Sequence, residues 1–222
     1  MADKLYNKNS IESLDPLAFT RLKPGVYAGD TTYSTQLLVE IISNSIDEFR
    51  LGHGNKIDVT IFKDPKVVIS VRDYAQGFLV NEVREDKKTV LEAAFSVLNT
   101  SGKYREDGTY EGTSLGSFGI GSKITNYLSH WLKVTTFRDG KYEQINFVEG
   151  KFKDRKVDKT TEPSGTLVVW EPSEEFFTHT DVEIKKVKSL FQTISCLCPG
   201  LRINLLYEGE STIFFSEKGL DD

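Results

Sequence analysis

A glycine-rich run that leads directly into a helix pattern is the feature that most restricts how this chain can fold. Four glycines stand in the run Gly112-Thr-Ser-Leu-Gly-Ser-Phe-Gly-Ile-Gly-Ser-Lys123, and a helix is predicted over residues 119–128. Glycines in such number cost conformational entropy on folding, so we expect a function for them. Backbone N–H groups of a glycine loop that opens a helix can cradle phosphate, and Lys123 adds a positive charge.

Two common nucleotide-binding motifs do not describe this run. It lacks the GxxxxGK[ST] pattern of a Walker A loop. A dinucleotide fingerprint needs a strand that feeds tightly into the loop within a short βαβ unit, and no such strand precedes it. The segment 99–117 is long and rich in Gly, Ser and Thr. We therefore expect a functional lid there, with a flexible surface loop as the alternative.

An amphipathic helix is predicted from Ser34 to Arg50. Its apolar face repeats at helical spacing through Leu37, Leu38, Ile41, Ile42, Ile46 and Phe49. Glu40 and Asn44 are four residues apart, so their side chains lie one above the other on a single face. The carboxylate can accept a proton from water, and the amide oxygen is a suitable ligand for Mg²⁺. A solvated polar face without chemistry is the alternative for this helix taken alone.

Two shorter motifs are suited to binding a flat polar ring. Asp73 ends a predicted strand and Gly77 follows four residues later, in the run Val71-Arg-Asp-Tyr-Ala-Gln-Gly77. The carboxylate can accept a hydrogen bond from an exocyclic amine such as that of adenine, and the glycine lets the backbone approach the ring. Thr166, after Gly165 at the start of a later strand, offers a hydroxyl. Each motif can also be an ordinary turn beside a strand.

The other patterns predict an α/β sandwich in which helices cover one face of a sheet. Strands are expected at 56–62, 67–72, 132–137, 142–148, 165–170 and 202–207, and further helices at 89–98 and 181–197. The polar residues 1–15 are expected to form an N-terminal arm. We expect residues 16–222 to form a single domain.

Composition excludes several classes of protein. The chain has 222 residues, a hydrophobic share of 38% and a net charge of −5, which excludes collagen-like and wholly disordered chains. A sequence pI near 5.4 argues against a stand-alone nucleic-acid binder. The spacing of Cys196 and Cys198 fits neither a zinc pair nor a CxxC motif. Since no apolar run reaches membrane-spanning length and no secretory signal is visible, we expect a cytoplasmic protein without a membrane partner.

Taken together and in this order, the motifs resemble those of the Bergerat-fold (GHKL) ATPases. This group comprises type IIA DNA topoisomerases, ninety-kilodalton heat-shock chaperones, MutL repair proteins and sensor histidine kinases. Three segments are similar to bacterial gyrase B and to the B subunit of topoisomerase IV: Arg21–Thr31, Glu40–Glu48 and Val97–Lys103. The resemblance extends from about Ser10 to Leu220. It implies an ATPase domain with a mixed, mostly antiparallel sheet, which couples ATP-driven dimer closure to DNA strand passage.

The resemblance also implies roles for individual residues. Glu40 would be the general base, Asn44 would bind Mg²⁺ and ATP, and Asp73 would bind the adenine amine. The other implied ATP contacts are Gly77, Lys103, Tyr110, Gly116, Gly119, Gly121, Lys123 and Thr166. Phe78 and Arg138 would lie at the mouth of the pocket, where aminocoumarin inhibitors contact members of the family.

The partners implied by the resemblance are ATP with Mg²⁺, a second copy of the protein, and a DNA-cleavage subunit of the gyrase A or topoisomerase IV A type. DNA would be bound through regions outside this chain. A following transducer domain supplies a lysine to the γ-phosphate in the family, so we expect weak turnover by this chain alone. A non-catalytic, nucleotide-gated dimerisation module and another branch of the GHKL group remain alternatives.

Several positions depart from the family pattern. Ser43 replaces the usual acidic residue before Asn44, and Ala75 replaces a glycine. Gln76 replaces an arginine, so Glu48 is expected to lose its ion-pair partner. These departures leave Glu40, Asn44 and Asp73 in place.

Overall fold

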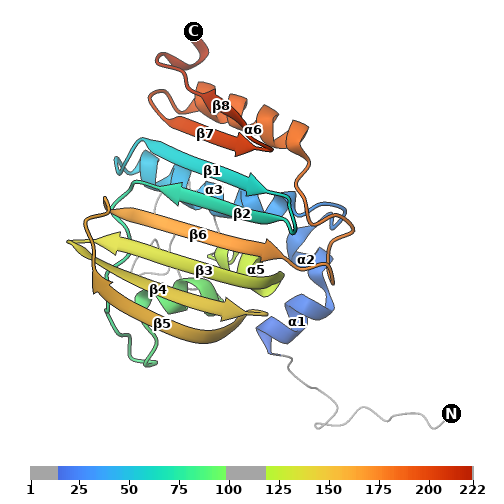
Figure 1. Ribbon diagram of the computed structural model, residues 1–222, viewed down its shortest axis with the longest axis vertical. Coiled ribbons are helices and arrows are strands. Elements are labelled where there is room, and N and C mark those ends of the chain that lie inside the picture. The colour runs from blue at the N-terminus through green and yellow to red at the C-terminus, as the bar shows by residue number, and fades with distance from the viewer. Residues whose placement is uncertain (1–14, 99–118, 222) are drawn as a thin grey trace, which may run out of the picture.

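The computed structural model describes residues 15–98 and 119–221. Within these ranges one sheet has the strand order β5-β4-β3-β6-β2-β1-β7-β8 (Figure 1). The strands are β1 (Lys56–Phe62), β2 (Val68–Asp73), β3 (Ser129–Arg138), β4 (Lys141–Val148), β5 (Lys151–Lys159), β6 (Gly165–Pro172), β7 (Arg202–Tyr207) and β8 (Glu210–Phe214). The pairing of β1 with β7 is parallel, and the other neighbouring strands described here pair antiparallel. The predicted mixed, mostly antiparallel sheet is confirmed.

The helices lie on one face of this sheet, as Figure 1 shows. They are α1 (Pro16–Leu22), α2 (Pro24–Ala28), α3 (Thr35–Arg50), α4 (Val90–Ser96), α5 (Gly121–Tyr127) and α6 (Ile184–Leu197), with a 3₁₀ turn at Gly219–Asp221. We call the sheet face that is turned away from these helices the outer face. The two-layer arrangement confirms the predicted α/β sandwich. None of the helices in the described ranges is long and apolar enough to cross a lipid bilayer.

Helix α3 packs across the middle of the sheet because its apolar stripe is almost completely buried. Leu37, Leu38 and Ile42 are each at most 1% exposed and belong to the main core cluster. Burial of one such side chain contributes about 1.5–3 kcal/mol to the free energy of folding. The helix ends at Arg50, before Gly52, which adopts a positive φ of 87°. The opposite, polar face of α3 is therefore held in a fixed position.

The sequence patterns did not predict β5 and β8, the two edge strands of the sheet. β5 has the sequence KFKDRKVDK and is exposed along nearly its whole length, so it shows no alternation of apolar and polar residues. Its backbone pairs with β4 all the same. A charged, exposed strand at the edge of a sheet hinders pairing with other chains.

Candidate functional site

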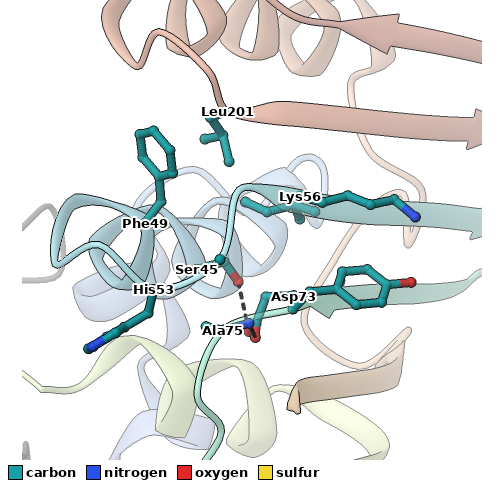
Figure 2. Close-up of a pocket in the computed structure, with 10 residues that line it drawn as sticks. Ser45, Phe49, His53, Lys56, Asp73, Ala75 and Leu201 are labelled. Atoms are coloured by element: carbon teal, nitrogen blue, oxygen red, sulfur yellow. Dashed lines mark hydrogen bonds between the residues drawn. The ribbon is translucent and has the colours of Figure 1, made fainter. Parts of the chain in front are cut away.

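The carboxylate of Asp73 is fixed at the end of β2, on the helix-covered face of the sheet. Its Oδ1 atom accepts hydrogen bonds from the backbone N–H groups of Ala75 (3.1 Å) and Thr166 (3.0 Å). Its Oδ2 atom lies 3.3 Å from the hydroxyl oxygen of Ser45 on α3. Figure 2 marks this hydrogen bond with a dashed line. A carboxylate oxygen can accept two hydrogen bonds, so Oδ2 keeps the capacity to accept another donor.

Burial dominates the electrostatics of Asp73, which is only 9% exposed. Burial raises the pKa of this carboxyl, while the N–H groups of Ala75 and Thr166, the charge of Arg72 and the Ser45 hydroxyl act in the opposite direction. Hydrogen-bond donors from the backbone and from Ser45 thus stabilise the Asp73 carboxylate, which is almost completely buried.

Two glycines allow the chain to close around Asp73. Gly165 has a φ of +135°, and a Cβ atom added to it would lie 2.2 Å from the Asp73 carbonyl oxygen. Gly77 has a φ of +71°, and an added Cβ would lie 2.6 Å from the carbonyl oxygen of Phe137. A side chain at either position would collide with backbone, so these glycines set the close approach of β2, β3 and β6.

Phe78 and Arg138, predicted at the mouth of the site, lie next to Gly77. The backbone N–H of Phe78 donates to the Thr136 hydroxyl oxygen at 2.7 Å. The Arg138 guanidinium donates to the carbonyl oxygen of Gly77 at 3.1 Å. The Phe78 ring meets Phe95 of α4 edge-on, with 6.5 Å between ring centroids. The structure therefore brings Gly77, Phe78 and Arg138 together at the end of the sheet that holds Asp73.

Glu40 lies at a second part of the site, where α3 meets the start of α5. Its Oε1 atom accepts a hydrogen bond from the Gln36 side chain at 2.6 Å. A Cβ atom added to Gly121 would lie 2.1 Å from Glu40 Oε2, so the carboxylate rests directly against the first residue of α5. Gly119, with a φ of +61°, precedes this contact. Asn44 follows one turn later on α3, where its side chain is exposed.

Helix α3 connects the two parts of the site. It carries Glu40 against Gly121 and, five residues later, Ser45 against Asp73. Five residues of α-helix rise by about 7.5 Å. The hydroxyl of Thr125 on α5 also donates to the Leu37 carbonyl oxygen of α3 at 3.2 Å, which holds the two helices together. The spacing of the two carboxylates thus depends on one rigid element.

Lys123, predicted to add a positive charge to the phosphate site, is buried and not exposed to solvent. Its side chain lies on α5 and is only 2% exposed. Burial lowers the pKa of the Lys123 amine to about 8, and the positive charge of Arg84 acts in the same direction. The predicted site residues Lys103, Tyr110 and Gly116 lie outside the residues that the structure describes.

Glu48 has polar partners despite the absence of the family arginine. Its Oε2 atom lies 3.1 Å from His53 Nδ1 and 3.4 Å from Gln76 Nε2. Gln76 therefore still reaches Glu48, through a hydrogen bond in place of an ion pair.

A shallow pocket lies between α3, the start of β1 and the turn after β2, with Asp73 in its wall (Figure 2). Its lining residues are Ser45, Phe49, His53, Gly54, Lys56, Ile57, Asp73, Tyr74, Ala75 and Leu201. Sequence analysis missed Ser45, whose only signal is a small polar residue within the buried stripe of α3. It also missed Arg72, whose only signal is a basic residue that follows the apolar residues of β2.

The two parts of the site are suited to different chemistry. A buried carboxylate with a spare acceptor can recognise an N–H donor of a flat ring. A carboxylate and an amide on one helix face can bind a metal ion that arrives with a phosphate ligand, because Mg²⁺ uses few protein ligands and keeps phosphate and water oxygens. Among the described residues no group of three or more His, Cys, Asp or Glu side chains is arranged to hold a metal ion by itself.

Comparison with known proteins gives close sequence relatives. The chain is 34% identical over 222 residues to the B subunit of DNA topoisomerase 4 from Bacillus subtilis. It is 32% identical over 220 residues to the B subunit of DNA gyrase from Thermotoga maritima. Each alignment covers 97% of this chain, and 33% or 34% of the relative, so the chain spans about a third of the length of these curated relatives. No protein-family model matches the sequence.

Solved structures with the same fold come from the same two groups of proteins, gyrase B and topoisomerase IV. The 43K ATPase domain of Thermus thermophilus gyrase B, solved in complex with an aminocoumarin, aligns with a TM-score of 0.76 and 25% identity. The topoisomerase IV ATP-binding domain of Francisella tularensis, in complex with a small-molecule inhibitor, aligns with a TM-score of 0.78 and 28% identity. Both alignments cover 92% of this chain, and 52% and 55% of those chains respectively.

Proposed function

We propose that this chain, which belongs to the family of GHKL ATPase domains of type IIA DNA topoisomerase B subunits, binds ATP and hydrolyses it at the site of Asp73 and Glu40. The observation that carries the proposal is that α3 holds both carboxylates in place, one against the end of β2 and one against the start of α5. Asp73 provides a hydrogen-bond acceptor for the adenine ring. Glu40 provides a proton acceptor beside Gly121 at the start of α5.

The base of ATP fits the end of the site at Asp73. Oδ1 already accepts two backbone N–H groups, so Oδ2 is the oxygen left to accept the 6-amino group of adenine. The Thr166 N–H donates to this carboxylate, and Thr166 and Gly77 would contact the ring. Gly77 and Gly165 let the backbone segments around Asp73 pack closely, which supports a fixed position for its carboxylate.

The phosphates would lie at the end of the site formed by α3 and α5. Glu40 would accept a proton from the attacking water, and Asn44 would be a ligand of Mg²⁺. The bound Mg²⁺ would neutralise charge on the phosphates. The backbone at Gly119 and Gly121, with Lys123 and the predicted lid residues Lys103 and Tyr110, would surround the triphosphate. Phosphoryl transfer depends mainly on such positioning and charge stabilisation.

For a longer protein that contains this chain, we propose that ATP binding closes a homodimer and that closure is coupled to passage of DNA, together with an A-type cleavage subunit. The relatives named above are B subunits of such enzymes. Residues 16–222 would be the single nucleotide-binding domain, and residues 1–15 the arm that reaches the second protomer.

A nucleotide-gated module without catalysis is the competing hypothesis, suggested by Ala75 and Gln76. The contacts of these residues argue against it. The N–H of Ala75 donates to Asp73, and Gln76 still bonds to Glu48. We therefore favour an active site, with slow turnover in this chain alone.

The test is single-turnover hydrolysis of ATP, with the 222-residue protein in excess and Mg²⁺ present. Glu40→Gln should reduce the rate by about 10²- to 10⁴-fold, the typical contribution of a general base, while ATP affinity changes little. Glu174→Gln, which removes an exposed carboxylate that pairs with Lys66, is the control and should hydrolyse ATP at the wild-type rate. Hydrolysis that survives Glu40→Gln would exclude Glu40 as the base. Tight ATP binding without any turnover by the wild type would favour the dimerisation module.

A further inference from the structure

The residue before Asp73 is a buried arginine for which the proposed ATP site has no role. Arg72 points to the outer face of the sheet, because neighbouring residues of a strand point to opposite faces. It is 9% exposed. Its guanidinium carbon lies 4.7 Å from the ring centroid of Tyr74 and 4.4 Å from that of Phe137. Contact with two aromatic rings restricts where the guanidinium can lie.

The guanidinium connects two backbone segments. Arg72 Nη1 donates to the carbonyl oxygen of Asp73, and Nη2 donates to the carbonyl oxygen of Pro163, both at 2.6 Å. One carbonyl belongs to the end of β2 and the other to the chain that enters β6. The rigid fork of a guanidinium presents two nitrogens at fixed positions, one for each oxygen.

The regular pairing of β2 with β6 stops where these contacts begin. The last paired residues are Arg72 and Leu167. Beyond them, the Thr166 N–H donates to Asp73 Oδ1. At Gly165 the chain approaches so closely that an added Cβ would lie 2.6 Å from Arg72 Nη1. Beyond this point the Asp73 side chain and the Arg72 guanidinium, in place of regular backbone pairing, connect the end of β2 to the chain that enters β6.

Further contacts on the outer face support the arginine. The Tyr74 hydroxyl donates to Asp58 Oδ2 at 2.7 Å, and the Asn204 side chain donates to Asp58 Oδ1 at 2.6 Å. The Lys56 amine lies 4.6 Å from the Tyr74 ring centroid. Tyr74 is thus anchored to β1 and β7, and through its ring it fixes one side of Arg72.

From these contacts we infer that Arg72 is a positioning residue for base recognition. It holds the ends of β2 and β6 together from the outer face, so that Asp73 Oδ1 stays bonded to Thr166 and Oδ2 stays directed toward a 6-amino group. The inference rests on the proposed function and adds a determinant of selectivity for adenine. Without the guanidinium, the two carbonyls lose their shared donor and the Asp73 carboxylate gains freedom to rotate.

The test compares affinities of the 222-residue protein for ATP and for inosine triphosphate, which carries a carbonyl where ATP has the amine. Calorimetry is performed on the wild type, Arg72→Gln and Arg72→Lys. The ATP-to-inosine-triphosphate affinity ratio should fall about tenfold in both variants, through weaker ATP binding, because the paired guanidinium hydrogen bonds to Asp73 and Pro163 are lost. Lysine keeps the charge, but its single nitrogen cannot reproduce the separate positions from which Nη1 and Nη2 donate, so it should not rescue the ratio.

Arg202→Gln is the matched control. Arg202 is the first residue of β7, the strand next to the edge strand β8, and its guanidinium carbon lies 4.8 Å from the ring centroid of Phe215. This variant should keep the wild-type ratio. Thermal unfolding identifies any variant that does not fold, and Arg72→Lys then carries the test alone.

Three results would overturn the inference: an unchanged ratio in the Arg72 variants, an equal loss of both ligands, or full rescue by lysine. The proposed function fails in a different way. A wild-type protein without preference for ATP would contradict adenine recognition itself, whatever the Arg72 variants do.

Discussion

The two ends of the site are built from different parts of the protein. At the end that we propose binds the base, called the base end, backbone N–H groups of Ala75 and Thr166 hold the Asp73 carboxylate, and that carboxylate is nearly removed from water. At the end that we propose binds the phosphates, called the phosphate end, Glu40 is held by the side chain of Gln36 and rests against Gly121. The first end is set by how the strands terminate, and the second by which side chains one helix presents.

This difference indicates how each end can be damaged. The base end should be sensitive to backbone changes, because its geometry depends on close approach between chain segments. The phosphate end should tolerate such changes better and respond to the charge of single side chains. Variants at the base end should therefore mainly lower the stability of the fold, and variants at the phosphate end should mainly lower activity.

The largest effect is expected for Gly165→Ala at the base end. The new Cβ would lie 2.2 Å from the Asp73 carbonyl oxygen, in a residue with a φ of +135°. Strain and overpacking together should lower the free energy of unfolding by about 3 to 4 kcal/mol. Gly140→Ala is the control, since Gly140 also has a positive φ but no atom within 4 Å of the added Cβ. It should cost only about 1 kcal/mol in urea unfolding. Equal costs would show that crowding at the base end is unimportant.

A smaller effect is expected from the titration of Lys123 at the phosphate end. Its pKa is about 8 in the ATP-free protein. Phosphate charge near the amine would raise this pKa, so ATP binding at pH 8 should take up about half a proton. Calorimetry in buffers of different ionisation enthalpy measures this uptake. Lys123→Met should abolish it, and an uptake that persists in this variant would assign the proton to another group.

The same shift in pKa predicts how stability depends on pH. The ordinary lysine pKa is 10.5, so the unfolded chain binds this proton more tightly than the folded protein does. The contribution of Lys123 to stability should therefore rise as the pH increases from about 8 to 10.5. Lys123→Met should remove this slope from urea-unfolding measurements.

The smallest effect is expected where a family ion pair is replaced by a hydrogen bond. Gln76→Arg would place a charge beside Glu48, which already contacts His53 at 3.1 Å. Exposed ion pairs contribute about 0.2–1 kcal/mol, so the variant should gain stability within that range. The gain should disappear at high salt, because salt screens surface charges. A gain that persists in about 1 M salt would point to packing of the longer side chain.

Sequence reasoning was most successful where burial imposes a period. The residues predicted for β1 and β7 are those observed, and α3 begins one residue after its predicted start. Apolar faces on these elements must turn toward the core, so the pattern determines the structure. β5 was missed because its exposed, charged residues leave no periodic signal. β8 was missed because it is only five residues long and Phe214 is its only buried residue.

For the proposed site, the sequence suggested side chains but not the contacts between them. Asp73 and Thr166 were placed beside the base, yet the bond from the Thr166 N–H to Asp73 depends on where two strands stop pairing. The roles of Ser45 and Arg72 were not predicted, because each acts through a neighbour that is distant in sequence or on the other face of the sheet. Glu48 was expected to lose the ion pair with the family arginine, and the structure shows that His53 and Gln76 both contact it instead.

The most direct test of the central claim is the nucleotide preference of Asp73→Asn. Asparagine keeps the shape and can still accept the two N–H groups through its oxygen, but it presents an amide donor toward the base. Calorimetry with ATP should show wild-type binding, and a loss of about a hundredfold or more in the variant, with inosine triphosphate affected much less. Equal ATP affinity in the wild type and in Asp73→Asn would contradict the account.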